Sequence, residues 1–239
     1  MLRYWIPIEK LDFNLFCRNP NPYTIEIIRK NPNKINWYYL SRNPNAIELL
    51  MENQDKIDWE NLSCNPYAIE LLMENPKKID WSNLSCNPYA IELLMKNKKK
   101  IDWINLCLNP NAVHIVEQNM NKINFQGWSA LSKNQNAVHL LEREPEKINW
   151  LNLSTNPNAI HLLEREPDNI DWWGLSQNPN AVHILEQNPE KIIWSQLSRN
   201  PSSNALTLLY NEIKTNPRKI NWIQLSKNPY IFEEEYDFK

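Results

Sequence analysis

The chain has 239 residues, of which 42% are hydrophobic and 11 are Trp, so it has ample material for a folded core and is not expected to be disordered. Its formal net charge of −2 lacks the basic excess of a generic nucleic-acid-binding protein. No apolar run approaches the ~20 residues needed to cross a bilayer, and the N-terminal sequence does not have the pattern of a secretory signal. We therefore expect a cytoplasmic protein with no membrane partner.

Residues 1–12 are rich in apolar side chains and are expected to form an N-terminal cap. A 22-residue unit then recurs along the chain. Its sequence in residues 65–86, NPYAIELLMENPKKIDWSNLSC, returns with few changes in residues 43–64 and 87–108. Self-similarity at a fixed period of this size is typical of stacked repeats, in which each unit buries its apolar face only against its neighbours.

Each unit opens with Asn, which is usually followed by Pro. Asn is a favourable N-cap because its side-chain oxygen accepts a free backbone N–H of the first helical turn, and Pro fits the first position of a helix. A helix of about eight or nine residues is expected to follow, with residues such as Ala68, Ile69 and Leu72 on one apolar face. The predicted caps are Asn43, Asn65, Asn87, Asn109, Asn134, Asn156, Asn178 and Asn200.

A second, shorter helix is expected to close each unit. A Pro ends the first helix, because the residue before Pro is driven out of the α region. The pattern Lys-Ile-Asp/Asn-Trp-x-x-Leu-Ser follows, in which Asp80 and its equivalents can cap a helix of about one turn. The regular position of the indoles indicates a structural core made by Trp37, Trp59, Trp81, Trp103, Trp128, Trp150, Trp172, Trp194 and Trp222.

Most steps between these positions are 22 residues, and the longer ones indicate insertions near Asn21, at residues 125–127 and at residues 202–213. Such insertions leave the stacking of units intact. After Asn228 the sequence becomes acidic, so residues 228–239 are expected to form a C-terminal cap or tail. The sequence thus predicts an all-α fold, an elongated α-helical solenoid of about nine 22-residue two-helix repeats that forms a single domain over residues 13–227.

These units read NPxAIxLL…KIxWxxLS, and in this they resemble the short tandem repeats in proteins of giant, amoeba-infecting DNA viruses. The resemblance extends from about Asp12 to Phe238, including the closing NPYIFEEEYDF. A looser likeness is to leucine-rich variant repeats, which alternate an α-helix with a 3₁₀ helix. The viral resemblance implies a helical repeat protein located in the host cytoplasm or in the virion, and it implies no particular biochemical activity.

One position of the first helix carries a row of ionisable residues, which is expected to face away from the apolar stripe. The row is acidic in the early units and changes to His in the later ones, where Arg follows on the next turn. It is either a binding face or an ordinary solvated surface. The candidate binding face comprises Glu48, Glu70, Glu92, His114, His139, Arg143, His161, Arg165 and His183.

No catalytic or metal-binding motif is found in the sequence. Stacked units hold the four His apart, whereas a shared zinc ion needs each nitrogen at ~2.0–2.1 Å, so no metal site is predicted. Cys64 and Cys86 are one unit apart and are expected to be small packing residues too distant for a disulfide. We expect a non-enzymatic protein without a cofactor, unless a pocket with a charged cluster lies at a break in the repeat, near Gln126 or Asn211.

The first hypothesis is a scaffold that presents an extended surface for interaction with a protein partner, which the sequence leaves unknown. The alternative is a nucleic-acid-binding solenoid that uses a row of lysines. Because the indoles are expected in the core, where they cannot stack on bases, lysine stems that cover the Trp layer are the simpler explanation of this row. The lysine row comprises Lys34, Lys56, Lys78, Lys100, Lys122, Lys147, Lys191 and Lys219.

Overall fold

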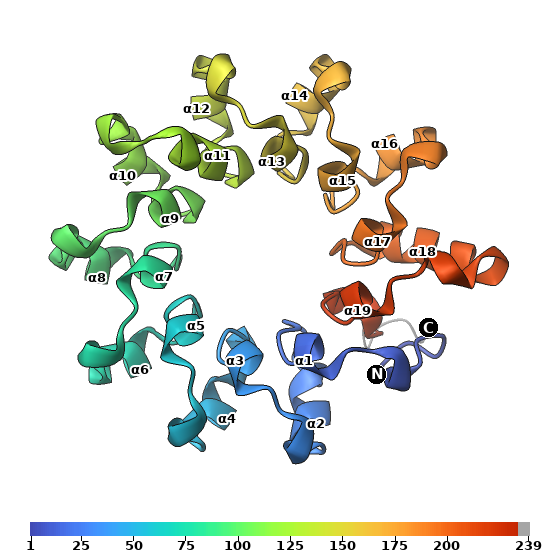
Figure 1. The fold of residues 1–239 in the computed structure, drawn as a ribbon, viewed down its shortest axis with the longest axis horizontal. Helices are drawn as coiled ribbons and strands as arrows, with labels where there is room; N and C mark the ends of the chain where they lie inside the picture. Colours follow the sequence, from blue (N-terminus) through green and yellow to red (C-terminus); the bar gives the residue numbers. More distant parts are fainter. Residues whose placement is uncertain (234–239) are drawn as a thin grey trace.

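The computed structural model describes residues 1–233, which form a closed ring of short helices (Figure 1). The predicted all-α repeat fold is confirmed: along the chain, helices near the centre of the ring alternate with helices near its outside. The array does not extend as a rod, because its last unit contacts its first. The elongated shape expected from the sequence is therefore corrected to a ring.

The shape of the unit explains this curvature. In a regular unit the outer layer holds an α-helix and a 3₁₀ helix, whereas the inner layer holds one short α-helix. The outer layer is therefore wider, and each unit is rotated in the same sense relative to the previous one. The described residues provide ten inner helices, so the circle is completed by ten units, where the sequence predicted about nine.

The inner helices are α1 (Phe13–Phe16), α3 (Trp37–Leu40), α5 (Trp59–Ser63), α7 (Trp81–Ser85), α9 (Trp103–Leu108), α11 (Phe125–Lys133), α13 (Trp150–Ser154), α15 (Trp172–Leu175), α17 (Trp194–Leu197) and α19 (Trp222–Leu225). The outer helices are α2 (Tyr23–Arg29), α4 (Ile47–Met51), α6 (Ile69–Glu74), α8 (Ile91–Lys96), α10 (Val113–Glu117), α12 (Val138–Arg143), α14 (Ile160–Arg165), α16 (Val182–Gln187) and α18 (Ser203–Thr215).

Within the described residues a short 3₁₀ helix precedes each inner helix, where the sequence predicted only that Pro ends the first helix. Capping by Asp or Asn then starts the inner helix; on α7, for example, Asp80 Oδ1 accepts a hydrogen bond from Asn83 N at 2.7 Å. The 3₁₀ helices are η1 (Ile8–Lys10), η2 (Pro32–Lys34), η3 (Pro44–Ala46), η4 (Gln54–Lys56), η5 (Pro76–Lys78), η6 (Lys98–Lys100), η7 (Met120–Lys122), η8 (Pro145–Lys147), η9 (Pro167–Asn169), η10 (Pro189–Lys191), η11 (Pro217–Lys219) and η12 (Pro229–Ile231).

Leucine and alanine, rather than Trp, fill the centre of the core. Leu84 on α7 and Ala90 at the start of α8 are fully buried, and so are their equivalents in the other units. Trp81 packs against this core from its edge and is partly exposed, and among the nine predicted core Trp only Trp128 is buried. The expected interior position of the indoles is thus corrected. Trp is the first residue of a very short helix, so its ring extends past the leucine layer.

A ladder of buried asparagines joins neighbouring units. Asn87 Nδ2 donates to the carbonyl oxygens of Ser63 at 3.1 Å and Asn65 at 2.8 Å, on either side of the point where the preceding unit begins. Each buried carbonyl thereby gains a partner that its own short helix does not supply, which avoids a penalty of about 1–3 kcal/mol per unpaired group. The asparagine ladder comprises Asn19, Asn43, Asn65, Asn87, Asn109, Asn134, Asn156, Asn178, Asn200 and Asn228, all buried.

All of these asparagines except Asn19 and Asn228 were predicted as caps of the first helix, and the structure refines this role. Asn87 Oδ1 accepts from Tyr89 N at 3.0 Å, so it closes the turn that precedes α8, whose N-cap residue is Ala90. Asn200 differs from the others: Ser202 caps α18, and Asn200 Oδ1 has no hydrogen-bond partner within the described part of the chain. The asparagines therefore serve mainly as links between units.

The contact between the two ends of the array, which we call the seam, repeats the contacts found between any two neighbouring units. Asn19 Nδ2 donates to Ser226 O at 3.0 Å and to Asn228 O at 2.9 Å. Asp12 N donates to Ser226 Oγ at 2.8 Å, just as Asp80 N donates to Ser63 Oγ at 3.0 Å inside the array. The unit that ends in α1 is thus assembled from residues 228–233 and the first residues of the chain.

Additional contacts reinforce the seam. Leu2 and Phe232 form an antiparallel β-bridge, Arg3 N donates to Ile231 O at 2.9 Å and Glu233 N donates to Met1 O at 2.7 Å. Residues 1–12 therefore contact the C-terminal end of the array, whereas the sequence predicted that they form a separate N-terminal cap. Of the predicted C-terminal cap, residues 228–233 take part in this contact, and residues 234–239 lie outside the described residues.

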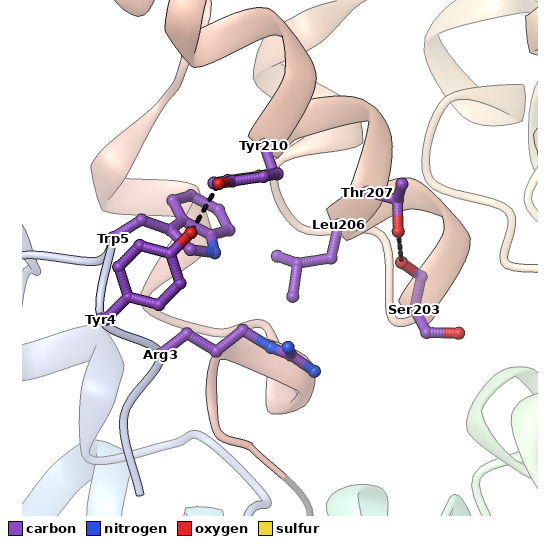
Figure 2. Close-up of a pocket in the computed structure, with 7 residues that line it drawn as sticks. All are labelled: Arg3, Tyr4, Trp5, Ser203, Leu206, Thr207 and Tyr210. Atoms are coloured by element: carbon purple, nitrogen blue, oxygen red, sulfur yellow. Dashed lines mark hydrogen bonds between the residues drawn. The ribbon is translucent and has the colours of Figure 1, made fainter. Parts of the chain in front are cut away.

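Tyr210, on the long helix α18, also contacts the start of the chain. Its hydroxyl points toward the hydroxyl of Tyr4, with which it forms a hydrogen bond, and its ring packs at 5.5 Å from the Trp5 ring (Figure 2). A cavity of about 200 Å³ lies beside these residues. The insertion that lengthens α18 thus supplies a surface on which the N-terminal residues rest.

Candidate functional site

The structure places all nine residues of the predicted binding face on exposed surfaces of the outer helices. They point away from the core, as the helical spacing predicted. The early and late units differ, however, in what surrounds these residues. The two sets of units differ at the residue three positions later in the same helix. This residue is Met after Glu48, Glu70 and Glu92, and it is Glu in the later units.

In the later units several of these His and Arg side chains lie beside carboxylates of the preceding unit. Arg143 Nη2 lies 2.6 Å from Glu117 Oε1, His161 Nε2 lies 2.9 Å from Glu142 Oε1, and the equivalent contact of His183 with Glu164 is 3.3 Å. These exposed pairs stabilise the ring weakly, by at most about 1 kcal/mol each. They do, however, give several of the charged side chains predicted for recognition a partner within the ring.

In the early units the equivalent surface is apolar and acidic. Met51, Met73 and Met95 form a row across α4, α6 and α8, with exposed fractions of 53%, 59% and 37%. Exposed glutamates flank the row, and only some of them are paired, as Glu92 is with Lys96 at 2.6 Å. We call this surface the methionine row; it consists of Met51, Met73 and Met95 with Glu48, Glu52, Glu70, Glu74 and Glu92.

Four lysines of the row, Lys78, Lys122, Lys191 and Lys219, lie over indole rings, as predicted. Lys78 Nζ is 4.4 Å from the centroid of the Trp59 ring in the preceding unit, and Lys122 Nζ is 4.2 Å from that of Trp103. The same contact crosses the seam, where Lys10 Nζ is 5.1 Å from the Trp222 ring. A base cannot stack on these ring faces while the ammonium groups cover them, so this geometry does not favour nucleic-acid binding along the lysine row.

A central cavity of about 610 Å³ is the feature that sequence reasoning missed. It is lined by the residue that directly precedes the buried asparagine in eight of the ten units, together with several of the prolines. We call its five basic residues the cavity cations. They are Arg18, Arg42, Lys133, Arg199 and Lys227. In the sequence, the position directly before the buried asparagine is often Arg or Lys. Without knowledge that the ring closes, this pattern does not indicate that the side chains converge.

The cavity cations have no carboxylate beside them in the cavity lining, and none of the five forms an ion pair with the described residues. Their mutual proximity is reflected in their pKa values. Burial, and then the charges of Arg42 and Arg199, lower the pKa of the Arg18 guanidinium. Burial and the charge of Arg199 likewise lower the pKa of Lys133, on the far side of the ring.

Two cysteines lie at the same position of the third and fourth units. Their Sγ atoms are 3.4 Å apart, which corrects the expectation that neighbouring units keep Cys64 and Cys86 well separated. The inner layer is the narrow side of each wedge-shaped unit, so side chains there approach closely. The hydrogen bond from Cys64 lowers the pKa of the Cys86 thiol to about 7, with Arg42 acting in the same direction and burial opposing it.

The breaks in the repeat were the expected location of any enzymatic pocket. A cavity of about 280 Å³ does lie beside Phe125 and Trp128, but its two charged residues, Glu146 and Lys147, are sequence neighbours that pair with each other at 3.8 Å. This arrangement contains no nucleophile beside a base. Within residues 1–233, no three His, Cys, Asp or Glu side chains group as metal ligands, and no helix has the length and apolarity required to cross a membrane.

Comparison of the chain with protein-family models, with curated proteins and with solved structures finds no match. Functional inference for this ring therefore depends on its own surfaces, of which the methionine row and the central cavity are the two with distinctive chemistry.

Proposed function

We propose that the protein is a non-enzymatic scaffold that binds a partner protein through the methionine row on α4, α6 and α8. The observation that carries this proposal is the exposure of Met51, Met73 and Met95, which occupy the same position of three successive outer helices. Met side chains are flexible and polarizable, so they adapt to apolar surfaces of a partner. The asparagine ladder supports the proposal as well, because it holds successive units, and therefore the row, in a fixed arrangement.

The charge around the row indicates the chemistry of the partner. Glutamates flank the Met side chains, and an arginine that approaches them, Arg29, is already bound to Glu52 at 2.7 Å. A partner segment with apolar residues on one face and Lys or Arg beside them would complement this surface. An amphipathic basic helix meets both requirements, since its apolar stripe can lie along the row while its cations reach the carboxylates.

A binding assay with a defined probe tests the proposal. We would measure the fluorescence anisotropy of a labelled amphipathic Leu/Lys peptide on addition of the ring. Replacing Met51, Met73 and Met95 by Ser removes the apolar contact without changing the charge, and it is expected to weaken binding about tenfold or more. Replacing Glu48, Glu70 and Glu92 by Lys is expected to have a similar or larger effect.

The later units provide a matched control. Replacing Glu117, Glu142 and Glu164 by Lys makes the same change in net charge on the outer helices of the later units, at the positions equivalent to the three Met. This variant is expected to bind the peptide nearly as well as the parent. Equal weakening by the early and late charge reversals, or unchanged binding by the serine variant, would contradict the proposal. Thermal unfolding of each variant shows whether the ring itself is intact.

A further inference from the structure

We propose that the central cavity binds a small, multiply phosphorylated ligand through the cavity cations, Arg18, Arg42, Lys133, Arg199 and Lys227. This site lies on the inside of the ring and takes a ligand of a different chemical class from the protein partner proposed above. It depends on the closure of the ring, because no single unit or pair of units contributes more than two of the five cations.

The arrangement of the cations comes first. Arg199, Lys227, Arg18 and Arg42 belong to the ninth, tenth, first and second units, so they form a continuous arc on both sides of the seam. Lys133 belongs to the sixth unit and approaches the same cavity from the opposite side. A ligand in the cavity would therefore meet positive charge from two directions.

The second argument is the lack of compensation. The other side chains that line the cavity are Pro, together with Cys64, Thr155 and Gln177, and none of these is an acid. Like charges that converge in a partly desolvated space repel one another and destabilise the folded ring. A bound polyanion removes this repulsion, because each guanidinium or ammonium then acquires an oppositely charged partner. In a chain with net charge −2, such a concentration of unpaired cations is the clearest departure from the overall composition.

Size and shape indicate the class of ligand. A cavity of about 610 Å³ is of the size that encloses small molecules rather than a folded partner. Three of the five cations are Arg, whose planar fork donates two parallel hydrogen bonds to phosphate. A single phosphate group reaches only part of the arc, whereas several phosphates on a compact molecule contact the arc and Lys133 together. The cavity lining contains no aromatic residue, so it offers no platform for the stacking that single-stranded nucleic acids use.

Isothermal titration calorimetry of the full chain tests the proposal. The probes are inositol hexakisphosphate and tripolyphosphate, with orthophosphate for comparison, at an ionic strength that screens weak surface attraction. We expect one equivalent of either polyphosphate to bind much more tightly than orthophosphate. Replacing Arg18, Arg42 and Arg199 by Gln is expected to weaken this binding by about 100-fold or more, since each charged hydrogen bond is worth more than a neutral one.

A control variant removes three exposed lysines elsewhere, by the substitutions Lys77→Gln, Lys98→Gln and Lys99→Gln, and so makes the same change in net charge. It is expected to bind the probes as the parent does. A second cavity variant, Lys133→Gln with Lys227→Gln, gives the same test should the arginine variant fail to fold. Three results would overturn the proposal. The protein could bind orthophosphate as tightly as the polyphosphates, both cavity variants could retain polyphosphate binding, or the control variant could lose as much affinity as the cavity variants. Tighter binding of a single-stranded oligonucleotide through the same residues would also overturn it.

Discussion

The seam and a regular junction between two units, such as the one between the units of α5 and α7, use the same chemistry with different connectivity. At the regular junction Asn87 bridges the carbonyls of Ser63 and Asn65, and at the seam Asn19 bridges those of Ser226 and Asn228 in the same way. The regular junction also has a covalent connection through the chain. The seam lacks this connection and has the Leu2–Phe232 bridge and the Tyr210 contacts in its place.

This difference shows that ring closure requires no specialised interface. Any unit presents a donor face and an acceptor face that match those of every other unit, so an array that curves through a full turn meets itself with complementary groups. The residues at the two ends only reinforce a junction that the repeat already specifies. Opening of the ring is consequently expected at the seam, since only there do all the contacts lack a covalent connection.

The largest effect is expected from the asparagine ladder. Asn87→Ala leaves buried backbone groups without two hydrogen-bond donors and one acceptor, and Asn19→Ala does the same at the seam. Each variant is therefore expected to lower the free energy of unfolding by about 2–4 kcal/mol. The two variants should differ in shape, because only Asn19→Ala frees one end of the array. Urea titration measures the stability, and small-angle scattering detects the increase in radius of gyration. A compact ring in Asn19→Ala would contradict the proposed weakness of the seam.

A smaller effect, of opposite sign, is expected from the cavity cations beside the seam. Replacing Arg18 and Arg199 by Gln removes repulsion across the seam, so the variant is expected to be more stable than the parent by up to about 1 kcal/mol at low ionic strength. Added salt should reduce this difference. Thermal unfolding at two salt concentrations provides the measurement, with Lys98→Gln and Lys99→Gln as the control, for which no gain is expected.

The lysine–tryptophan contacts allow a closer comparison of the two kinds of junction. Lys78→Ala removes the contact with Trp59 at 4.4 Å, and Lys10→Ala removes the longer contact with Trp222 at 5.1 Å across the seam. Both are partly exposed sites, so losses of about 0.5–1 kcal/mol are expected, the seam variant losing less. Chemical denaturation of both variants checks the order. A larger loss for Lys10→Ala would mean that this lysine does more for closure than its regular equivalents do.

The smallest effect on the fold is expected from alkylation of Cys86, which lies at a regular junction. Its pKa is lowered to about 7, so the reactive thiolate appears as the pH rises through this value rather than through the ordinary thiol range. Burial raises the pKa of Cys107 to about 12 and also raises the pKa of Cys17, so both thiols stay protonated and unreactive. Mass spectrometry of iodoacetamide-treated protein from pH 6 to about 9 should show modification of Cys86 first. Arg42→Gln is expected to shift its profile to higher pH.

Much of the unit could be predicted from the sequence, because local rules determine it. The Asn-Pro start, the Pro stop and the Asp80 cap each act within a few residues, and the positions of the helices follow from them. The exposure of the ionisable row also followed from helical spacing alone. The lysine stems over the indoles were predictable for a similar reason, since both residue types recur in register throughout the array.

The ring and its cavity depend on quantities that no single unit displays. Curvature is the sum of small rotations, and whether ten of them close a circle depends on the difference in width between the two layers. The residue at position Arg18 looks the same in sequence whether it lies on the concave or the convex side. The partial exposure of Trp81 was missed because periodicity identifies which residues share a face, whereas their depth depends on how short the helix is.

Closure also constrains how this gene can change. An open array of repeats tolerates the gain or loss of a whole unit, because each remaining junction is unaffected. Here an eleventh unit would leave the ends overlapping and a ninth would leave them apart, so unit number is fixed by geometry. Variation is confined to insertions within a unit. The three that exist, near Asn21, at residues 125–127 and at residues 202–213, all leave the hydrogen bonds between successive buried asparagines in place.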